Sequence, residues 1–113
     1  MTVDWYYHRN GCTTCGRAQA YLARHRIEPE QVVDAKKTRF GADEALKMAR
    51  AARVLYVTKG KKVIRLDVTR SQPTDDELLA LLVGRSGYLR APALRAGHCL
   101  FVGFEPAMFE REL

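Results

Sequence analysis

The sequence predicts an α/β fold in which a βαβ half and a ββα half share a mixed sheet, with a short helix and a hairpin inserted between them. Two observations lead to this fold class. The chain opens with a strand, a helix and a strand within about 30 residues, as in a parallel βαβ unit, and it closes with two extended segments and a helix. With 113 residues, 47% of them hydrophobic, we expect residues 1–113 to form one domain around one core.

The first half of the chain carries the βαβ pattern. Residues 3–8 are predicted as a strand because they are rich in aromatic and β-branched side chains. Residues 13–25 are predicted as a helix because apolar side chains recur at helical spacing. Pro29 ends that helix, and residues 31–35 are predicted as a short apolar strand.

The middle of the chain supplies the inserted helix and hairpin. Residues 43–53 are predicted as a helix, with an alanine-rich apolar stripe and acidic side chains at its positive end. Residues 54–58 and 62–68 are predicted as two strands that turn at Gly60.

A capping box starts the next predicted helix. Thr74 and Glu77 have the spacing in which each side chain binds the backbone of the other, and a leucine-rich run follows up to Gly84. The remaining predicted elements are an extended segment, a strand and a short helix, at residues 89–93, at residues 99–104 and from Glu105 onward.

Two cysteines stand where the first strand meets the first helix, in the pattern Cys12-Thr13-Thr14-Cys15. Unpaired N–H groups and the helix dipole at a helix start favour the thiolate form of Cys12. Cys15 follows one turn later on the same side, where it can attack a mixed disulfide on Cys12. Thr13, Arg9 and Arg17 support the site, the two arginines by adding positive charge. We therefore predict that Cys12 is the nucleophile and Cys15 the resolving thiol.

Other interpretations of the cysteines are a zinc site and an inert pair. Zinc needs about four ligands, and no second metal motif accompanies Cys99 and the three histidines, so we expect no metal. Cys99 lies in an apolar run with Leu100 and Val102, so we expect it to be buried and without a redox role. His8 and His25 have no carboxylate nearby in the sequence, so neither is assigned a role as a general base.

Charge and hydropathy limit the partners. The net charge is +6, but the basic residues are scattered and their densest groups have no interleaved aromatic residues. We expect a solvated basic surface and no nucleic-acid partner.

No apolar run approaches the roughly 20 residues of a spanning helix, and the first residues do not have the pattern of a signal peptide. We therefore expect a cytoplasmic protein that does not contact a membrane, in a reducing compartment where close cysteines are redox-active or bind metal.

Two segments resemble a known family. The run Cys-Thr-Thr-Cys-Gly-Arg-Ala-Gln-Ala-Tyr-Leu at 12–22 resembles the first motif of the family of glutaredoxin-linked arsenate reductases and Spx-type regulators. Leu-Arg-Ala-Pro-Ala-Leu at 89–94, followed by Leu-Phe-Val-Gly-Phe at 100–104, resembles its second motif. The resemblance implies a thioredoxin-like fold in which Pro92 is a cis proline that faces Cys12. It also implies that Arg90, Ala91 and Pro92 bind the substrate.

The resemblance and the cysteine pair together predict a thiol–disulfide oxidoreductase. Its substrate would be a disulfide of a protein or a small molecule, or an oxyanion. It would need no bound cofactor, because an external thiol such as glutathione, glutaredoxin or thioredoxin would reduce it. One alternative is a redox-sensing regulator of the Spx type, which contacts the transcription machinery. A weaker alternative is a glutaredoxin-linked arsenate reductase, since Ala91 stands where the family has an arginine before the proline.

Overall fold

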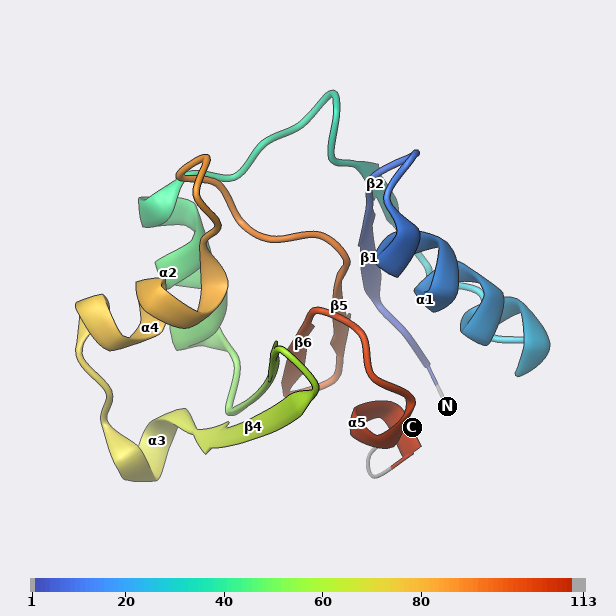
Figure 1. Cartoon of the computed structure of the whole chain (residues 1–113). Coiled ribbons are helices and arrows are strands. Elements are labelled where there is room, and N and C mark those ends of the chain that lie inside the picture. Colours follow the sequence, from blue (N-terminus) through green and yellow to red (C-terminus); the bar gives the residue numbers. More distant parts are fainter. Residues whose placement is uncertain (1, 111–113) are drawn as a thin grey trace.

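A six-stranded mixed sheet forms the centre of the computed structural model, which describes residues 2–110 (Figure 1). The strands, in chain order, are β1 (Trp5–His8), β2 (Val32–Asp34), β3 (Val54–Lys59), β4 (Lys62–Asp67), β5 (Ala93–Ala96) and β6 (Cys99–Val102). Their order across the sheet is β2-β1-β5-β6-β3-β4. β1 is parallel to β2 and β3 is parallel to β6, whereas the other neighbouring pairs are antiparallel.

Helices cover both faces of this sheet (Figure 1). The helices, in chain order, are α1 (Thr13–Arg24), α2 (Ala42–Ala51), α3 (Val68–Ser71), α4 (Asp75–Leu82) and α5 (Pro106–Glu110). α1 and α5 pack on one face and α2 and α4 on the other, because their buried side chains belong to separate core clusters. The predicted fold class is therefore confirmed, with β3 and β4 extending the sheet beyond β6.

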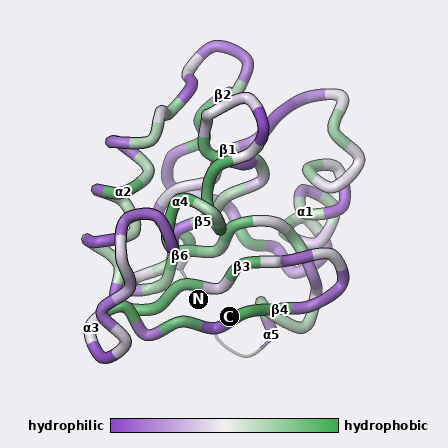
Figure 2. Tube along the Cα trace, turned by 60° about the vertical axis from the view of Figure 1, so that its left-hand side comes forward, coloured by the Kyte–Doolittle hydropathy of each residue, from purple (hydrophilic) through white to green (hydrophobic). Residues whose placement is uncertain are grey.

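Alternation along the strands separates these two clusters. On β1, Tyr6 faces α1 and α5, whereas Trp5 and Tyr7 face α2 and α4. On β3, Tyr56 and Leu55 divide between the two faces in the same way. This period of two is what a strand buried on both faces requires, and Figure 2 shows hydrophobic strands in the middle of the molecule with hydrophilic turns around them.

Several element boundaries differ from the predicted ones. The strand predicted at 99–104 ends at Val102, because Gly103 has a φ of +88° and donates its N–H to the Pro92 carbonyl at 2.8 Å. Of the segment predicted as extended at 89–93, only Ala93 joins β5. Leu89 instead forms an isolated bridge with Val83.

The short helix α3 was not predicted from the sequence. The Asp67 carboxylate accepts N–H bonds from Thr69 and Arg70, both at 3.1 Å, and so starts a helical turn where β4 ends. Val68, predicted as the last residue of that strand, is therefore the first residue of α3. The predicted capping box of Thr74 and Glu77 is present at the start of α4.

Candidate active site

Cys12 lies at the N-cap of α1, just beyond the carboxyl end of β1. Gly11 makes the turn that separates them, with a φ of +83°, a conformation that glycine adopts without strain. The Cys12 Sγ accepts a hydrogen bond from the Cys15 N–H at 3.4 Å, as the side chain of a helix N-cap does. Cys12 is partly exposed and Thr13, the first residue of α1, is exposed, so this end of the helix faces solvent.

Cys15 has the opposite environment. Its side chain is fully buried, and both cysteines are free thiols. Burial raises the pKa of Cys15 to about 12, and a hydrogen bond to Cys12 and the charge of Cys12 act in the same direction. The backbone and charge of Arg9 act in the opposite direction but do not overcome burial. The pair therefore combines an accessible sulfur with a buried sulfur that holds its proton.

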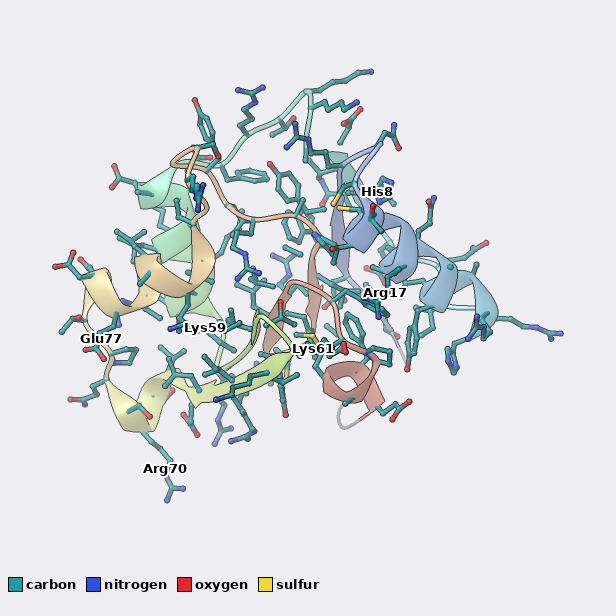
Figure 3. All side chains as sticks on the ribbon, viewed as in Figure 1. His8, Arg17, Lys59, Lys61, Arg70 and Glu77 are labelled. Atoms are coloured by element: carbon teal, nitrogen blue, oxygen red, sulfur yellow. The ribbon has the colours of Figure 1, made fainter. Side chains whose placement is uncertain are left out.

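Tyr6 and His8 lie beside this pair, although neither was predicted as a site residue. The Tyr6 hydroxyl donates to the Cys15 carbonyl at 3.2 Å and lies 2.8 Å from His8 Nδ1. Burial raises the pKa of Tyr6, as do Cys15 and Cys12. Figure 3 shows His8 beside the start of α1. The side chain of His8 is therefore paired with a phenol. Strand alternation could have predicted this pair, because it places residues 6 and 8 on one face.

A basic cavity of about 340 Å³ opens beside Cys12. Its cationic side chains come from three segments of the chain and are Arg9, Lys36, Arg39 and Arg90. Among the described residues that line it there is no aspartate or glutamate. Arg39 lies over the ring of Tyr88, 5.4 Å from its centroid.

Of these cations, Lys36 and Arg39 were not predicted as site residues. They follow β2 and reach the site because the Leu89 N–H donates to the Phe40 carbonyl at 2.8 Å.

The segment before β5 forms the wall opposite the start of α1. The Ala91–Pro92 peptide bond is cis, and Pro92 is buried. Ala91 lines the cavity next to Cys12. The segment is anchored by backbone bonds from Arg90 to the Leu82 carbonyl at 2.9 Å and from Gly103 to the Pro92 carbonyl at 2.8 Å.

Arg90 has partners within the protein as well as a place in the cavity wall. Its Nη1 donates to the carbonyls of Thr58 at 3.0 Å and Leu81 at 3.1 Å, and its Nη2 donates to Thr58 Oγ1 at 3.3 Å. Burial lowers its pKa. The guanidinium therefore ties the site segment to β3 and α4, a role that its sequence position did not reveal.

The two supporting arginines lie on different sides of Ala91. Arg9 lines the cavity of Cys12. Arg17 stacks over Phe104, 5.3 Å from the ring centroid, and lines a second cavity of about 590 Å³ together with Lys61. Figure 3 shows Arg17 on α1 facing the β3–β4 turn that carries Lys61. Ala91 and Arg90 line both cavities.

Cys99 belongs to a different part of the molecule. It is the first residue of β6, paired with Ala96 and Val54, and it is partly exposed. The prediction that it is buried is therefore wrong, because its position at the strand end leaves one side open.

Within residues 2–110, no three His, Cys, Asp or Glu side chains gather as metal ligands. No helix in that range has the length and apolar character needed to cross a membrane.

The sheet order, with α1 directly after β1, and the match to solved structures give this chain a thioredoxin-like fold. The chain belongs to the ArsC family, whose model matches residues 7–111. No curated protein matches the sequence.

Solved structures share the fold at low sequence identity. An ArsC family related protein from Bacteroides fragilis matches with a TM-score of 0.59 and 17% identity over 98% of each chain. A protein from Staphylococcus aureus matches with a TM-score of 0.58 and 20% identity over 97% of each chain. An arsenate reductase (ArsC) related protein from Brucella melitensis matches with a TM-score of 0.52 and 22% identity, over 99% of this chain and 94% of that one.

Proposed function

We propose that this chain is a thiol–disulfide oxidoreductase that uses Cys12 as nucleophile and Cys15 as resolving thiol. The observation that carries the proposal is the contrast between the two sulfurs. Cys12 is partly exposed at the N-cap of α1, and Cys15 is buried one turn further along the helix. The cavity beside Cys12 provides room for a substrate sulfur.

In the first step the Cys12 thiolate attacks one sulfur of the substrate disulfide. A Cys12–substrate disulfide forms, the substrate S–S bond breaks, and the other substrate sulfur leaves as a thiolate that takes a proton from water. The Cys15 N–H donates to the Cys12 Sγ at 3.4 Å, and Arg9 lines the same cavity as Cys12.

In the second step Cys15 loses its proton to solvent and attacks the Cys12 sulfur. Burial is the main cause of the high pKa of Cys15, but Cys12 contributes to it through a hydrogen bond and through its charge. Both contributions from Cys12 end when Cys12 is held in the mixed disulfide, so Cys15 becomes easier to deprotonate at the moment it must react.

The second substrate thiolate leaves, and Cys12 and Cys15 remain joined by a disulfide. The substrate has then gained two electrons and the cysteine pair has lost two. Two equivalents of an external thiol, such as glutathione, or a reduced glutaredoxin or thioredoxin, return these electrons and become oxidised. We place this cycle in the cytosol, where such thiols are kept reduced.

We assign substrate docking to the segment that faces Cys12. The half-buried Ala91 forms an edge of the cavity wall, where an extended substrate would pair with its backbone. Arg90 and Pro92 hold that edge in place through the bonds described above.

The test is reduction of the neutral compound 2-hydroxyethyl disulfide, coupled to each external thiol in turn. We expect saturable turnover by the wild-type protein and by Cys99→Ser, the matched cysteine control. We expect Cys15→Ser to accumulate a mixed disulfide on Cys12 that mass spectrometry identifies. Absence of turnover with every reductant, or a mixed disulfide on Cys15, would overturn the proposal.

The same proteins test the two alternatives. A redox-sensing regulator would gain or lose a binding partner when the Cys12–Cys15 disulfide forms, and it would not turn over a disulfide substrate. An arsenate reductase would turn over arsenate with glutathione and glutaredoxin. We expect little arsenate turnover, because Ala91 offers no guanidinium and that of Arg90 binds Thr58 and Leu81.

A further inference from the structure

Two basic cavities meet at Ala91. The first contains Cys12 and the cations Arg9, Lys36 and Arg39. The second contains the cations Arg17 and Lys61, with Glu105 as its acidic group. Arg90 and Ala91 belong to the walls of both, so the two cavities form one surface that runs past the reactive cysteine.

The cations of this surface are available to a ligand. The side chains of Arg9, Lys36, Arg39, Arg17 and Lys61 are all exposed. Within residues 2–110, no carboxylate forms a salt bridge with any of these five. Asp34 directly precedes two residues of the first cavity, and its carboxylate accepts the backbone N–H of Lys36 at 2.9 Å. The side-chain charges therefore remain largely uncompensated.

Two of the guanidinium groups are also oriented. Arg39 stacks over Tyr88 in the first cavity, and Arg17 stacks over Phe104 in the second. A planar guanidinium held by an aromatic ring keeps its edge free for hydrogen bonds, and that edge matches the two oxygens of a carboxylate. Each cavity thus offers one oriented carboxylate-binding group and at least one lysine.

The position of Cys12 on this surface indicates the shape of the anionic ligand that would bind there. Cys12 lines only the first cavity, and Ala91 separates it from the second. A small disulfide that reacts with Cys12 would need only the first cavity, of about 340 Å³, and would not reach the cations of the second. An extended chain that crosses Ala91 places residues on one side of its cysteine in the first cavity and residues on the other side in the second.

We propose that the substrate is an acidic polypeptide segment, with carboxylate side chains on both sides of the cysteine that exchanges with Cys12. This inference rests on the proposed function and adds the class of its substrate. Exposed charges of this kind act mainly on the rate of association, so the preference should decrease as salt increases.

The experiment uses eight-residue peptides, each with one cysteine in a disulfide with 2-mercaptoethanol. The residues on each side of the cysteine are glutamate or glutamine, which gives peptides that are acidic on both sides, on either side alone or on neither. We expect kcat/KM to be about tenfold higher for the doubly acidic peptide than for the neutral one at low salt, with each acidic side contributing about threefold. We expect 0.5 M NaCl to remove most of this difference.

Charge variants locate the two contacts. Arg39→Gln should reduce the advantage of glutamate on one side of the cysteine by about threefold, and Lys61→Gln should do so on the other side. Arg70→Gln is the matched control, because Arg70 is an exposed cation on α3, at the far end of the molecule from α1 (Figure 3). It should leave every ratio unchanged.

The outcomes separate the two proposals. Equal kcat/KM for acidic and neutral peptides would overturn the substrate class while leaving the oxidoreductase function intact. Glutathione disulfide that reacts as fast as the doubly acidic peptide would have the same consequence. If no disulfide is turned over, the proposed function fails. The substrate class is then decided by fluorescence anisotropy with serine in place of the peptide cysteine. Tighter binding of the doubly acidic peptide supports the class, and equal Kd values overturn it.

Discussion

The two segments that form the walls of the site are held in different ways. The turn before α1 depends on contacts a few residues apart, such as the Cys15 N–H to Cys12 Sγ and the Gly16 N–H to the Cys12 carbonyl at 2.9 Å. The segment around Ala91 depends on contacts with distant parts of the chain, including Phe40 and Thr58. The half of the site that contains Cys12 thus depends on local contacts, whereas the opposite wall depends on the whole fold.

This difference predicts that changes in the first segment affect chemistry and changes in the second affect stability as well. The Cys12→Ser variant provides the largest expected effect. We expect kcat/KM for disulfide reduction to fall at least about a thousandfold, because serine is not a nucleophile in this exchange. The free energy of unfolding should change by less than about 0.5 kcal/mol, because serine is itself a favoured helix N-cap. Enzyme kinetics and urea denaturation measure both quantities, and a large loss of stability would contradict the local character of this segment.

The second prediction concerns Gly103, which holds the Pro92 carbonyl. A Cβ at this position would collide with Thr58 Oγ1, and the φ of +88° disfavours any side chain. We expect Gly103→Ala to lower the free energy of unfolding by about 2–4 kcal/mol, measured in urea.

Gly97→Ala is the matched control, since Gly97 also has a positive φ, of +59°, but open space around it. It should cost about 1 kcal/mol, as expected for backbone strain alone. Equal losses in the two variants would show that the contact with Thr58 is unimportant.

The third prediction distinguishes two roles of Arg90. If it holds the wall in place, Arg90→Met leaves the Thr58 and Leu81 carbonyls without these donors and lowers the free energy of unfolding by about 2–3 kcal/mol. The value of kcat/KM then falls by a similar factor for neutral and anionic disulfides. Arg90→Lys should restore part of the stability.

If Arg90 instead acts only by binding anionic substrates, stability stays unchanged and only the anionic substrates lose rate. The exposed Arg95 of β5 supplies the control, Arg95→Met, for loss of a positive charge nearby.

The smallest expected effect is a dependence of stability on pH that comes from Cys15. The unfolded chain releases this thiol proton near the ordinary value of 9.0, but burial keeps it bound up to about pH 12 in the folded protein. Above pH 9 the folded state therefore binds more protons than the unfolded state, and stability falls as the pH rises. With solvent screening, we expect less than about 1 kcal/mol at pH 10.

Urea midpoints of the wild type and of Cys15→Ala between pH 8 and pH 10 test this dependence. The slope should be smaller in the variant, and identical slopes would argue against a buried, protonated Cys15. Iodoacetamide at pH 8 offers a second check, because it should modify the accessible Cys12 before the buried Cys15.

Local patterns were sufficient to predict the cysteine pair and the elements other than α3. Strand alternation, helical spacing and the capping box of Thr74 and Glu77 involve residues a few positions apart, and such patterns have nearly the same meaning in any fold. The N-cap position of Cys12 is local in the same sense, and so it too followed from the sequence.

The tertiary structure decided the rest of the site. Lys36 and Arg39 line the cavity of Cys12, and a backbone hydrogen bond joins the segments that contain Phe40 and Leu89, which are far apart in the sequence. The partners of Arg90 lie on β3 and α4, and no sequence spacing relates them. Such contacts depend on how the sheet and helices pack together, and that arrangement is a property of the whole chain and not of any short segment.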